Sequence, residues 1–170
     1  MSKLRGWRIS LARRWIVPAA AALGAMMLLW GLWPMPALYV VNETRRHTIA
    51  RWPVRDSASV RLHYVHSIYQ QPAVEEFDIR PTGFELVRLA SPSVAVLEYY
   101  ARPEPITAAD DGYAVRLSPQ VYSRLSLLVG NTGRRTLSYG GRELPLYQAA
   151  ADGDRISLVV QRTPRVALAW

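Results

Sequence analysis

An uncharged stretch from Trp15 to Asn42 follows a short basic segment that carries Lys3, Arg5, Arg8, Arg13 and Arg14. The helix-compatible part of this stretch, Trp15 to Trp33, has 19 residues. As a helix it would be about 27 Å long, enough to cross the hydrocarbon core of a bilayer. Tryptophan lies at both of its ends, where aromatic rings settle at membrane interfaces. We therefore predict a single N-terminal transmembrane helix.

Three prolines set the expected limits of this helix. Pro18 would lie in its first turn, where the missing N–H costs little. Pro34 and Pro36 would end it, because the residue before a proline is disfavoured in the helical region.

Two interpretations of the segment remain open, a retained signal-anchor and a cleaved signal peptide. The apolar run is longer than a signal core of about 7–15 residues. The exit from Leu32 to Ala37 is rich in proline and lacks a clean small-x-small cleavage site. Because basic residues stay in the cytoplasm, we expect residues 1–14 inside, residues 15–36 in the membrane and residues 37–170 exported. In a bacterium this is a single-pass inner-membrane protein with a periplasmic domain.

The formal net charge of +8 is concentrated in the leader. Residues 1–41 carry one Lys and four Arg without any acid, whereas residues 42–170 carry sixteen Arg against thirteen acids. In the second part the arginines alternate with acids, and a nucleic-acid interface would require them to cluster on one element. We expect no nucleic-acid partner. The chain has no cysteine, which excludes disulfides, thiol nucleophiles and thiolate metal sites.

The pattern after Pro36 changes to short, strand-like segments separated by turn signals. We expect strands at 37–41, 48–52, 59–66, 74–80, 84–89, 94–100, 113–117, 124–129, 136–139, 143–147 and 155–161. Residues 118–122 and 148–151 could each hold one helical turn. This spacing predicts a mainly β domain, an antiparallel β-sandwich or an open barrel.

The segment from Tyr64 to Phe77 carries the only chemistry that stands out. If its two flanking strands pair with their apolar faces together, Leu62 lies opposite Ile79 and Tyr64 opposite Phe77. His66 then lies opposite Glu75, within reach of a hydrogen bond.

Two interpretations of this hairpin are open. In one, the His66–Glu75 pair caps the core and fixes the loop; in the other, it lines a pocket for a ligand or metal. Our candidate ligand-binding or polar core residues are His66, Ser67, Glu75, Tyr64 and Pro72. We predict no catalytic residue, because His66 and Ser67 point to opposite faces of a strand and no Gly-x-Ser-x-Gly elbow is present. We expect no dedicated metal site and no cofactor.

The segment from Gly130 to Gly133, followed by Arg134 and Arg135, has two interpretations as well. It could form an anion-binding nest of backbone amides, or a hairpin turn with solvated arginines.

The His66-Ser67 pair, followed by Pro72, Glu75 and Phe77, resembles the signature of the DUF1850 family of small exported bacterial proteins. The spacing of Leu137, Gly141, Leu144, Gly153 and Ile156-Ser157-Leu158 is similar to the C-terminal half of that family. The resemblance covers roughly residues 37–162. The chain departs from it where many members carry a Gly-Ala-Gly loop, since it has Ser91-Pro92-Ser93 there.

The resemblance implies a role beside tripartite transporters of the TRAP type that use TAXI solute-binding proteins. Our first hypothesis is a membrane-anchored binding or accessory module that contacts the transporter permease or its solute-binding protein. The alternatives are a periplasmic hydrolase with a His66–Glu75 acid–base pair and a purely structural envelope protein.

Overall fold

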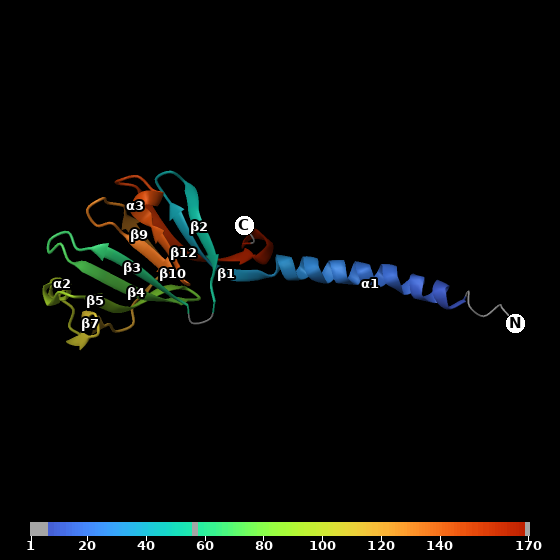
Figure 1. Cartoon of the computed structure of the whole chain (residues 1–170), viewed down its shortest axis with the longest axis horizontal. Coiled ribbons are helices and arrows are strands. Elements are labelled where there is room, and N and C mark those ends of the chain that lie inside the picture. Colours follow the sequence, from blue (N-terminus) through green and yellow to red (C-terminus); the bar gives the residue numbers. More distant parts are fainter. Residues whose placement is uncertain (1–6, 56–57, 169–170) are drawn as a thin grey trace. The chain divides into compact units, whose positions relative to one another are not determined.

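The computed structural model describes residues 7–55 and 58–168, without the side chains of residues 7–15 and 17. Contacts divide the chain into two compact units. One contains the long helix α1 (Trp7–Leu32) and a short 3-10 helix, η1 (Arg165–Leu168). The other, which we call the β-domain, runs from Pro36 to Arg162 (Figure 1).

Helix α1 confirms the predicted helix but begins earlier than expected. We predicted Trp15–Trp33, whereas α1 begins at Trp7, inside the basic segment, and ends at Leu32. Pro18 therefore lies in the helix interior and not in the first turn, where it removes one backbone hydrogen bond. Strand β1 begins at Pro34, so the helix ends where the prolines predicted. Residues 1–6 of the predicted leader lie outside the described residues.

The apolar side chains of α1 are spread around the helix and do not form one stripe. Those described are exposed, among them Leu23 at 57% and Met27 at 69%. At the end of the helix, the Arg165 guanidinium lies 4.7 Å from the ring centroid of Trp30. No helix in the described part of the chain has the length and hydropathy of a membrane span.

The β-domain consists of two sheets (Figure 1). The smaller has the order β2-β1-β12-β9, with β1 (Pro34–Asn42), β2 (His47–Pro53), β9 (Arg124–Leu128) and β12 (Arg155–Pro164). The larger has the order β11-β10-β3-β4-β5-β7-β6, with β8 added beside β5. Its strands are β3 (Ser59–Val65), β4 (Pro72–Arg80), β5 (Gly83–Ser91), β6 (Ile106–Ala109), β7 (Gly112–Arg116), β8 (Val121–Tyr122), β10 (Thr136–Tyr139) and β11 (Arg142–Pro145).

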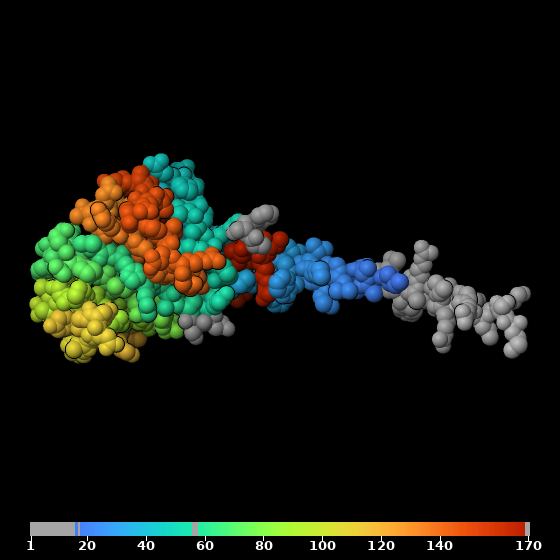
Figure 2. Space-filling model, viewed as in Figure 1, coloured from blue at the N-terminus to red at the C-terminus, as the bar shows by residue number. Residues whose placement is uncertain are grey.

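One hydrophobic core lies between the two sheets. Leu38 and Ile156 of the smaller sheet and Phe84 of the larger are fully buried in it. At one end Trp52 of β2 stacks on Tyr139 of β10 with ring centroids 5.7 Å apart, so the two sheets are in contact there. In the space-filling view, the teal and orange parts of the β-domain lie against each other (Figure 2). Every pair whose register the described residues define is antiparallel. The predicted mainly β, antiparallel fold is confirmed, with two sheets and no closed barrel in the described part.

Three local predictions were wrong. Residues 94–100 form a helix, α2 (Val94–Tyr99), and not a strand. Ser93 occupies the N-cap position after Pro92, and the helix buries Val96 and Leu97 against the core. Residues 118–122 contain strand β8 and not a helical turn. The strand expected at 143–147 ends at Pro145, where the short helix α3 (Leu146–Ala149) begins. Strand β6 had not been predicted.

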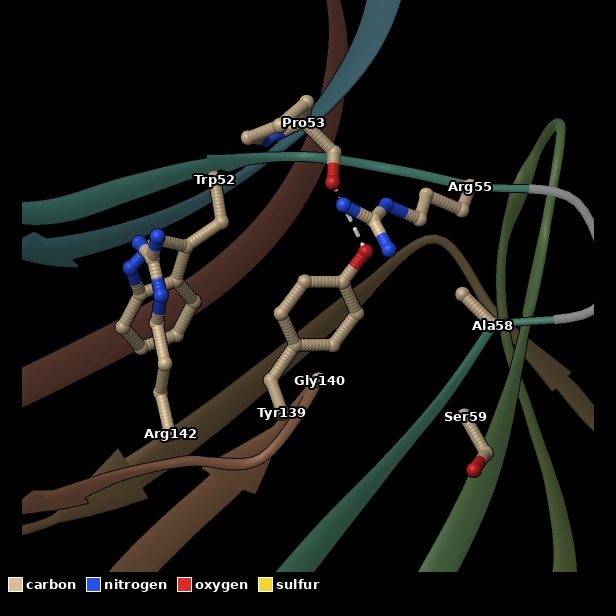
Figure 3. A pocket seen from close by; sticks show the side chains of 8 residues that line it. All are labelled: Trp52, Pro53, Arg55, Ala58, Ser59, Tyr139, Gly140 and Arg142. Atoms are coloured by element: carbon tan, nitrogen blue, oxygen red, sulfur yellow. Dashed lines mark hydrogen bonds between the residues drawn. The ribbon is translucent and has the colours of Figure 1, made fainter.

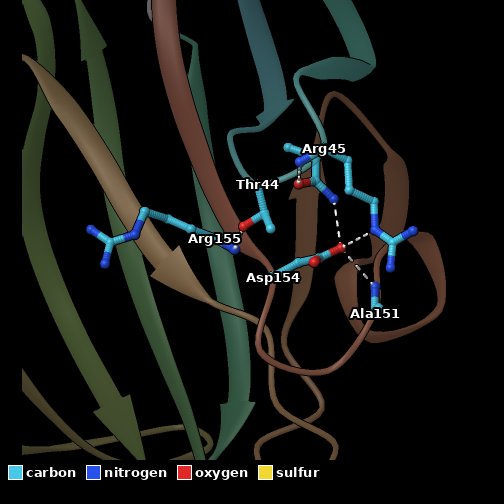
Figure 4. A network of polar contacts seen from close by, with 6 residues as sticks. Thr44, Arg45, Ala151, Asp154 and Arg155 are labelled. Carbon is cyan, nitrogen blue, oxygen red and sulfur yellow. Dashed lines mark hydrogen bonds and ion pairs between the residues drawn. The ribbon is translucent and has the colours of Figure 1, made fainter.

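A buried carboxylate joins the β1–β2 turn to the start of β12 (Figure 4). Asp154 Oδ2 accepts hydrogen bonds from Asn42 Nδ2 at 2.8 Å, from Arg45 Nε at 2.9 Å and from the backbone N–H of Ala151 at 3.1 Å. The Asn42 amide, followed by Arg45, lowers the pKa of Asp154. The backbone N–H of Arg155 also donates to Thr44 Oγ1 at 2.9 Å. These bonds fix the end of the smaller sheet.

Candidate functional site

The β3–β4 hairpin pairs in a different register from the predicted one. Leu62 lies opposite Glu75 and not Ile79, and Tyr64 lies opposite Ala73 and not Phe77. The turn is tighter than expected, because the backbone N–H of His66 donates to the Gln71 carbonyl and β4 starts at once at Pro72. The shift preserves the two faces of the strands, so the residues expected to share a face still do so.

The predicted opposition of His66 and Glu75 is therefore wrong. His66 lies just beyond β3, where the Gln70 N–H donates to its carbonyl and Gln70 adopts a positive φ of 52°. The length of the turn sets the register of the hairpin. This turn pairs the His66 N–H with the Gln71 carbonyl, so His66 does not lie opposite Glu75. His66 is instead buried among aromatic rings, with centroid distances of 5.3 Å to Tyr69 and 4.8 Å to Tyr99.

Helix α2 brings the missing partners to this hairpin. Its C-terminal end carries Tyr99 and Tyr100, and the Tyr100 ring lies 6.2 Å from the His66 ring. The Tyr64 hydroxyl is in hydrogen-bond contact with the Tyr100 hydroxyl. Tyr99 and Tyr100 were missed from the sequence, because residues 94–100 were interpreted as a strand. The adjacent pair of tyrosines was the available signal.

Glu75 belongs to a chain of polar groups with these tyrosines. Because it is diagonal to Tyr64 across the ladder, their side chains can meet, and Tyr64 Oη donates to Glu75 Oε1 at 3.0 Å. The polar chain thus runs from Glu75 to Tyr64 and on to Tyr100. His66 contacts its far end through the Tyr100 ring.

Burial raises the pKa of the Glu75 carboxyl, although the Tyr64 hydrogen bond and the charges of Arg135 and Arg102 oppose the rise. Burial, together with the charge of Glu75, also raises the pKa of the Tyr64 phenol. The pKa of Tyr100 is raised as well, mainly by burial. Both phenols therefore remain neutral donors at physiological pH, and the protonated form of Glu75 is favoured relative to a solvated carboxyl.

This polar chain borders a cavity of about 280 Å³ lined by residues of both sheets. Glu75, Tyr100, Arg102 and Arg124 supply polar groups to its lining. The apolar part comes from β4, β5, β8 and β9 and includes Phe77, Leu86, Leu89, Tyr122, Leu125 and Leu127. Arg124 is ion-paired with Glu43 at 2.7 Å. The cavity thus combines an apolar wall with a hydrogen-bonding carboxyl–phenol chain and guanidinium groups.

Of the five hairpin candidates, only Glu75 lines this cavity, and Ser67 and Pro72 also lie outside the polar chain. Ser67 is exposed, and its carbonyl accepts a hydrogen bond from Gln70 Nε2 at 2.5 Å. The carbonyl of Pro72 accepts a hydrogen bond from Ser91 Oγ at 2.8 Å. Ser91 itself is buried and its hydroxyl also accepts from the Ser93 N–H. Ser91 therefore holds the start of β4 close to the loop that leads into α2.

Arg134 and Arg135 are separated by the structure. Arg135 lies with its guanidinium carbon 5.8 Å from the Tyr64 ring centroid and donates to the Leu128 carbonyl at 2.7 Å. Arg134 adopts a positive φ of 41° in the loop. This loop joins β9 of one sheet to β10 of the other, so the hairpin interpretation was wrong. The anion-binding nest remains a prediction.

Within the described residues, no three His, Asp or Glu side chains come together as metal ligands would.

A protein-family model described as "Domain of unknown function (DUF1850)" matches residues 60–146, just over half of the chain. No curated protein and no solved structure matches. The matched segment contains Tyr64, Glu75, Tyr100, Arg102 and Arg135. The matched segment is shorter than the range 37–162 expected from the sequence, and β1, β2 and β12 lie outside it.

Proposed function

The chain belongs to the DUF1850 family, and we propose that it is a membrane-anchored binding module that holds a small organic acid between its two sheets. The observation that carries this proposal is the hydrogen-bonded chain of Glu75, Tyr64 and Tyr100 beside the cavity of about 280 Å³. Small-molecule sites are typically apolar clefts with a few fixed polar groups.

The cavity composition suggests the chemical class of the ligand. Its volume of about 280 Å³ lies just below the usual range of about 300–1,000 Å³, which favours a molecule of a few carbon atoms. The leucines and Phe77 suit an apolar body. Arg102 suits a carboxylate, because a guanidinium binds a carboxylate through charge-assisted hydrogen bonds. Because Tyr64 donates its hydroxyl hydrogen to Glu75, the Tyr100 hydroxyl donates to Tyr64, and its oxygen can act as an acceptor at the same wall.

The hydrolase alternative depended on a direct acid–base pair between His66 and Glu75. In the observed register His66 does not lie opposite Glu75. The His66 ring lies near the Tyr100 ring, and Tyr100 is linked to Glu75 through Tyr64, so that alternative has lost its supporting geometry. We therefore favour binding over catalysis. The accessory role beside a TRAP-type transporter, with the permease or its solute-binding protein as partner, stays part of the proposal and rests on the family resemblance.

We also propose that α1 anchors the chain in the inner membrane. Its exposed apolar side chains, spread around the helix, need an apolar environment, which a bilayer would supply. Trp30 and Trp33 at its end suit an interface. The basic segment before Trp15 favours a cytoplasmic N-terminus and a periplasmic β-domain.

The binding proposal can be tested by calorimetric titration of the full chain in dodecyl maltoside micelles with hexanoate and glutarate. We expect at least one of the two acids to bind. Arg102→Gln should weaken that binding about tenfold or more, because a charge-assisted hydrogen bond is lost. Tyr100→Phe should weaken it less.

The matched controls are Arg116→Gln and Tyr113→Phe, two exposed positions outside the cavity. Both should bind as the parent chain does. Binding of neither acid, or equal losses in the controls and in Arg102→Gln, would rule out the proposed ligand class at this site.

A further inference from the structure

Two further cavities in the β-domain are lined by arginines. One, of about 350 Å³, is lined by Arg55 and Arg142 beside the stacked rings of Trp52 and Tyr139 (Figure 3). The other, of about 520 Å³, is lined by Arg55, Arg80 and Arg162. Arg55 borders both, so the two cavities adjoin. We call them together the arginine cavities.

The described residues that line the arginine cavities carry positive charge. Among the described residues, which exclude 56–57, no Asp or Glu lines either cavity. Arg80 is ion-paired with Glu85 at 2.5 Å and with Asp78 at 3.2 Å. These carboxylates neutralise its charge, so Arg80 contributes little to the net charge of the cavity. Arg55, Arg142 and Arg162 are exposed and supply the remaining charge. Such a surface attracts anions.

The groups between the arginines also suit a ligand with an apolar part. Val54, Ile79 and Val160 line the larger cavity. In the smaller one, the Tyr139 hydroxyl donates to the Pro53 carbonyl at 2.8 Å, and the Arg55 guanidinium lies beside it (Figure 3). Burial raises the pKa of Tyr139 and the charge of Arg55 opposes the rise. The hydrogen bond to Pro53 thus fixes the position of the Tyr139 ring in the smaller cavity without a ligand.

The larger cavity includes both ends of the β-domain. Pro36 is the first residue of the β-domain and Arg162 is the last, and both residues line this cavity. Only three peptide units separate Trp33 from Pro36, a span of no more than about 11 Å. If α1 ends at the membrane surface, this tether keeps the cavity within reach of lipid headgroups.

We propose that the larger of the arginine cavities forms a binding site for a phosphate group, held by the guanidinium groups of Arg55 and Arg162, which both line it. Guanidinium groups bind phosphate oxygens in bidentate fashion, which favours phosphate over a single-point anion. The phosphate comes from a membrane lipid or from a soluble phosphate ester. The lipid source rests on the proposed membrane anchor, whereas phosphate binding itself does not.

The site is tested by calorimetric titration of the full chain with glycerol 3-phosphate in dodecyl maltoside micelles, which contain no phosphate. We expect binding that weakens as salt is added. Arg55→Gln and Arg162→Gln should each weaken it about tenfold or more. Arg116→Gln, the same change at an exposed arginine outside both cavities, should leave it unchanged. Because these arginines are exposed, all three variants should fold, which circular dichroism checks.

Absence of binding in micelles, or binding that Arg55→Gln and Arg162→Gln leave intact, would overturn the proposal. A second arm distinguishes the sources by repeating the titration in phosphatidylglycerol nanodiscs. Loss of glycerol 3-phosphate binding there identifies lipid headgroups as the occupant, and retained binding identifies a soluble ester. A chain that fails to enter the nanodiscs contradicts the anchor alone, because the micelle titration still decides the phosphate site.

Discussion

Two carboxyl groups of the β-domain respond in opposite ways to their surroundings. Glu75 is enclosed beside the cavity and burial raises its pKa, so its charged form destabilises the fold. Asp154 is buried too, but the hydrogen bond from Asn42 stabilises its charged form and lowers its pKa. The difference lies in the number of donors, since Asp154 Oδ2 accepts three hydrogen bonds and Glu75 accepts one from Tyr64.

The first prediction concerns Glu75 and pH. Above the ordinary value of 4.5, the unfolded chain loses the Glu75 proton while the folded chain keeps it. The free energy of unfolding therefore falls as pH rises from there to the raised pKa, by at most about 1.4 kcal/mol per pH unit. Glu75→Gln, which cannot ionise, should remove this fall.

The measurement is urea unfolding of the full chain in micelles at intervals from about pH 4 to about pH 8. The stability of Glu75→Gln relative to the parent should rise with pH across this window. Glu143→Gln, at an exposed position on β11, serves as control and should not reproduce the effect. A difference that stays constant with pH would show that the Glu75 carboxyl is solvated in the folded chain.

Among the elements, the β3–β4 hairpin shows how much a turn decides. Strand limits and faces were predicted from alternation, because the side-chain period of a strand is two residues. The register depended on the tight turn between His66 and Gln71, which alternation does not encode. Helix α2 was missed for a related reason. Its apolar residues satisfy a strand pattern, and only packing of Val96 and Leu97 against the core selects the helix.

The second prediction concerns the turn between β4 and β5. Gly83 has a φ of 148°, and a Cβ there would meet the backbone of Tyr122 and would lie 2.8 Å from the Ser123 Cα. Gly83→Ala should therefore lower the free energy of unfolding by more than about 1 kcal/mol, as measured by urea unfolding.

Gly130→Ala is the matched control for this change. Its Cβ would meet no heavy atom within 4 Å, and its φ is not positive. It should be neutral or stabilise by at most about 1 kcal/mol, because alanine restricts the unfolded chain. Equal effects of the two substitutions would mean that the β5–β8 contact does not press on Gly83.

The whole molecule is proposed to be held in the membrane by α1, and the third prediction tests this anchor. The full chain should remain in the membrane fraction after alkaline carbonate extraction. Leu23→Arg places a charge near the centre of the apolar run, at a cost of about 2.5–3.5 kcal/mol, and should reduce the retained fraction. Leu128→Arg in the β-domain, where the parent side chain is equally exposed at 57%, should leave it unchanged.

Sidedness is checked with a reporter enzyme fused after Trp170, which should be active only when exported. Recovery of the full chain from a detergent-free soluble fraction would contradict the anchor. A mature chain trimmed near Ala37 would instead support the signal-peptide alternative, with an exported but untethered β-domain.

The amino-acid sequence alone determined the helix at the N-terminus, most strand positions and the hairpin that carries Tyr64 and Glu75. These features depend on local periodicity and on proline, which act within a few residues of the chain. The tertiary structure decided the partners. It brought Tyr100 and Arg102 to Glu75, and it placed Arg55 beside Arg162, although each pair is far apart in sequence. Such contacts depend on register and on how two sheets pack, and a local pattern is compatible with several of these arrangements.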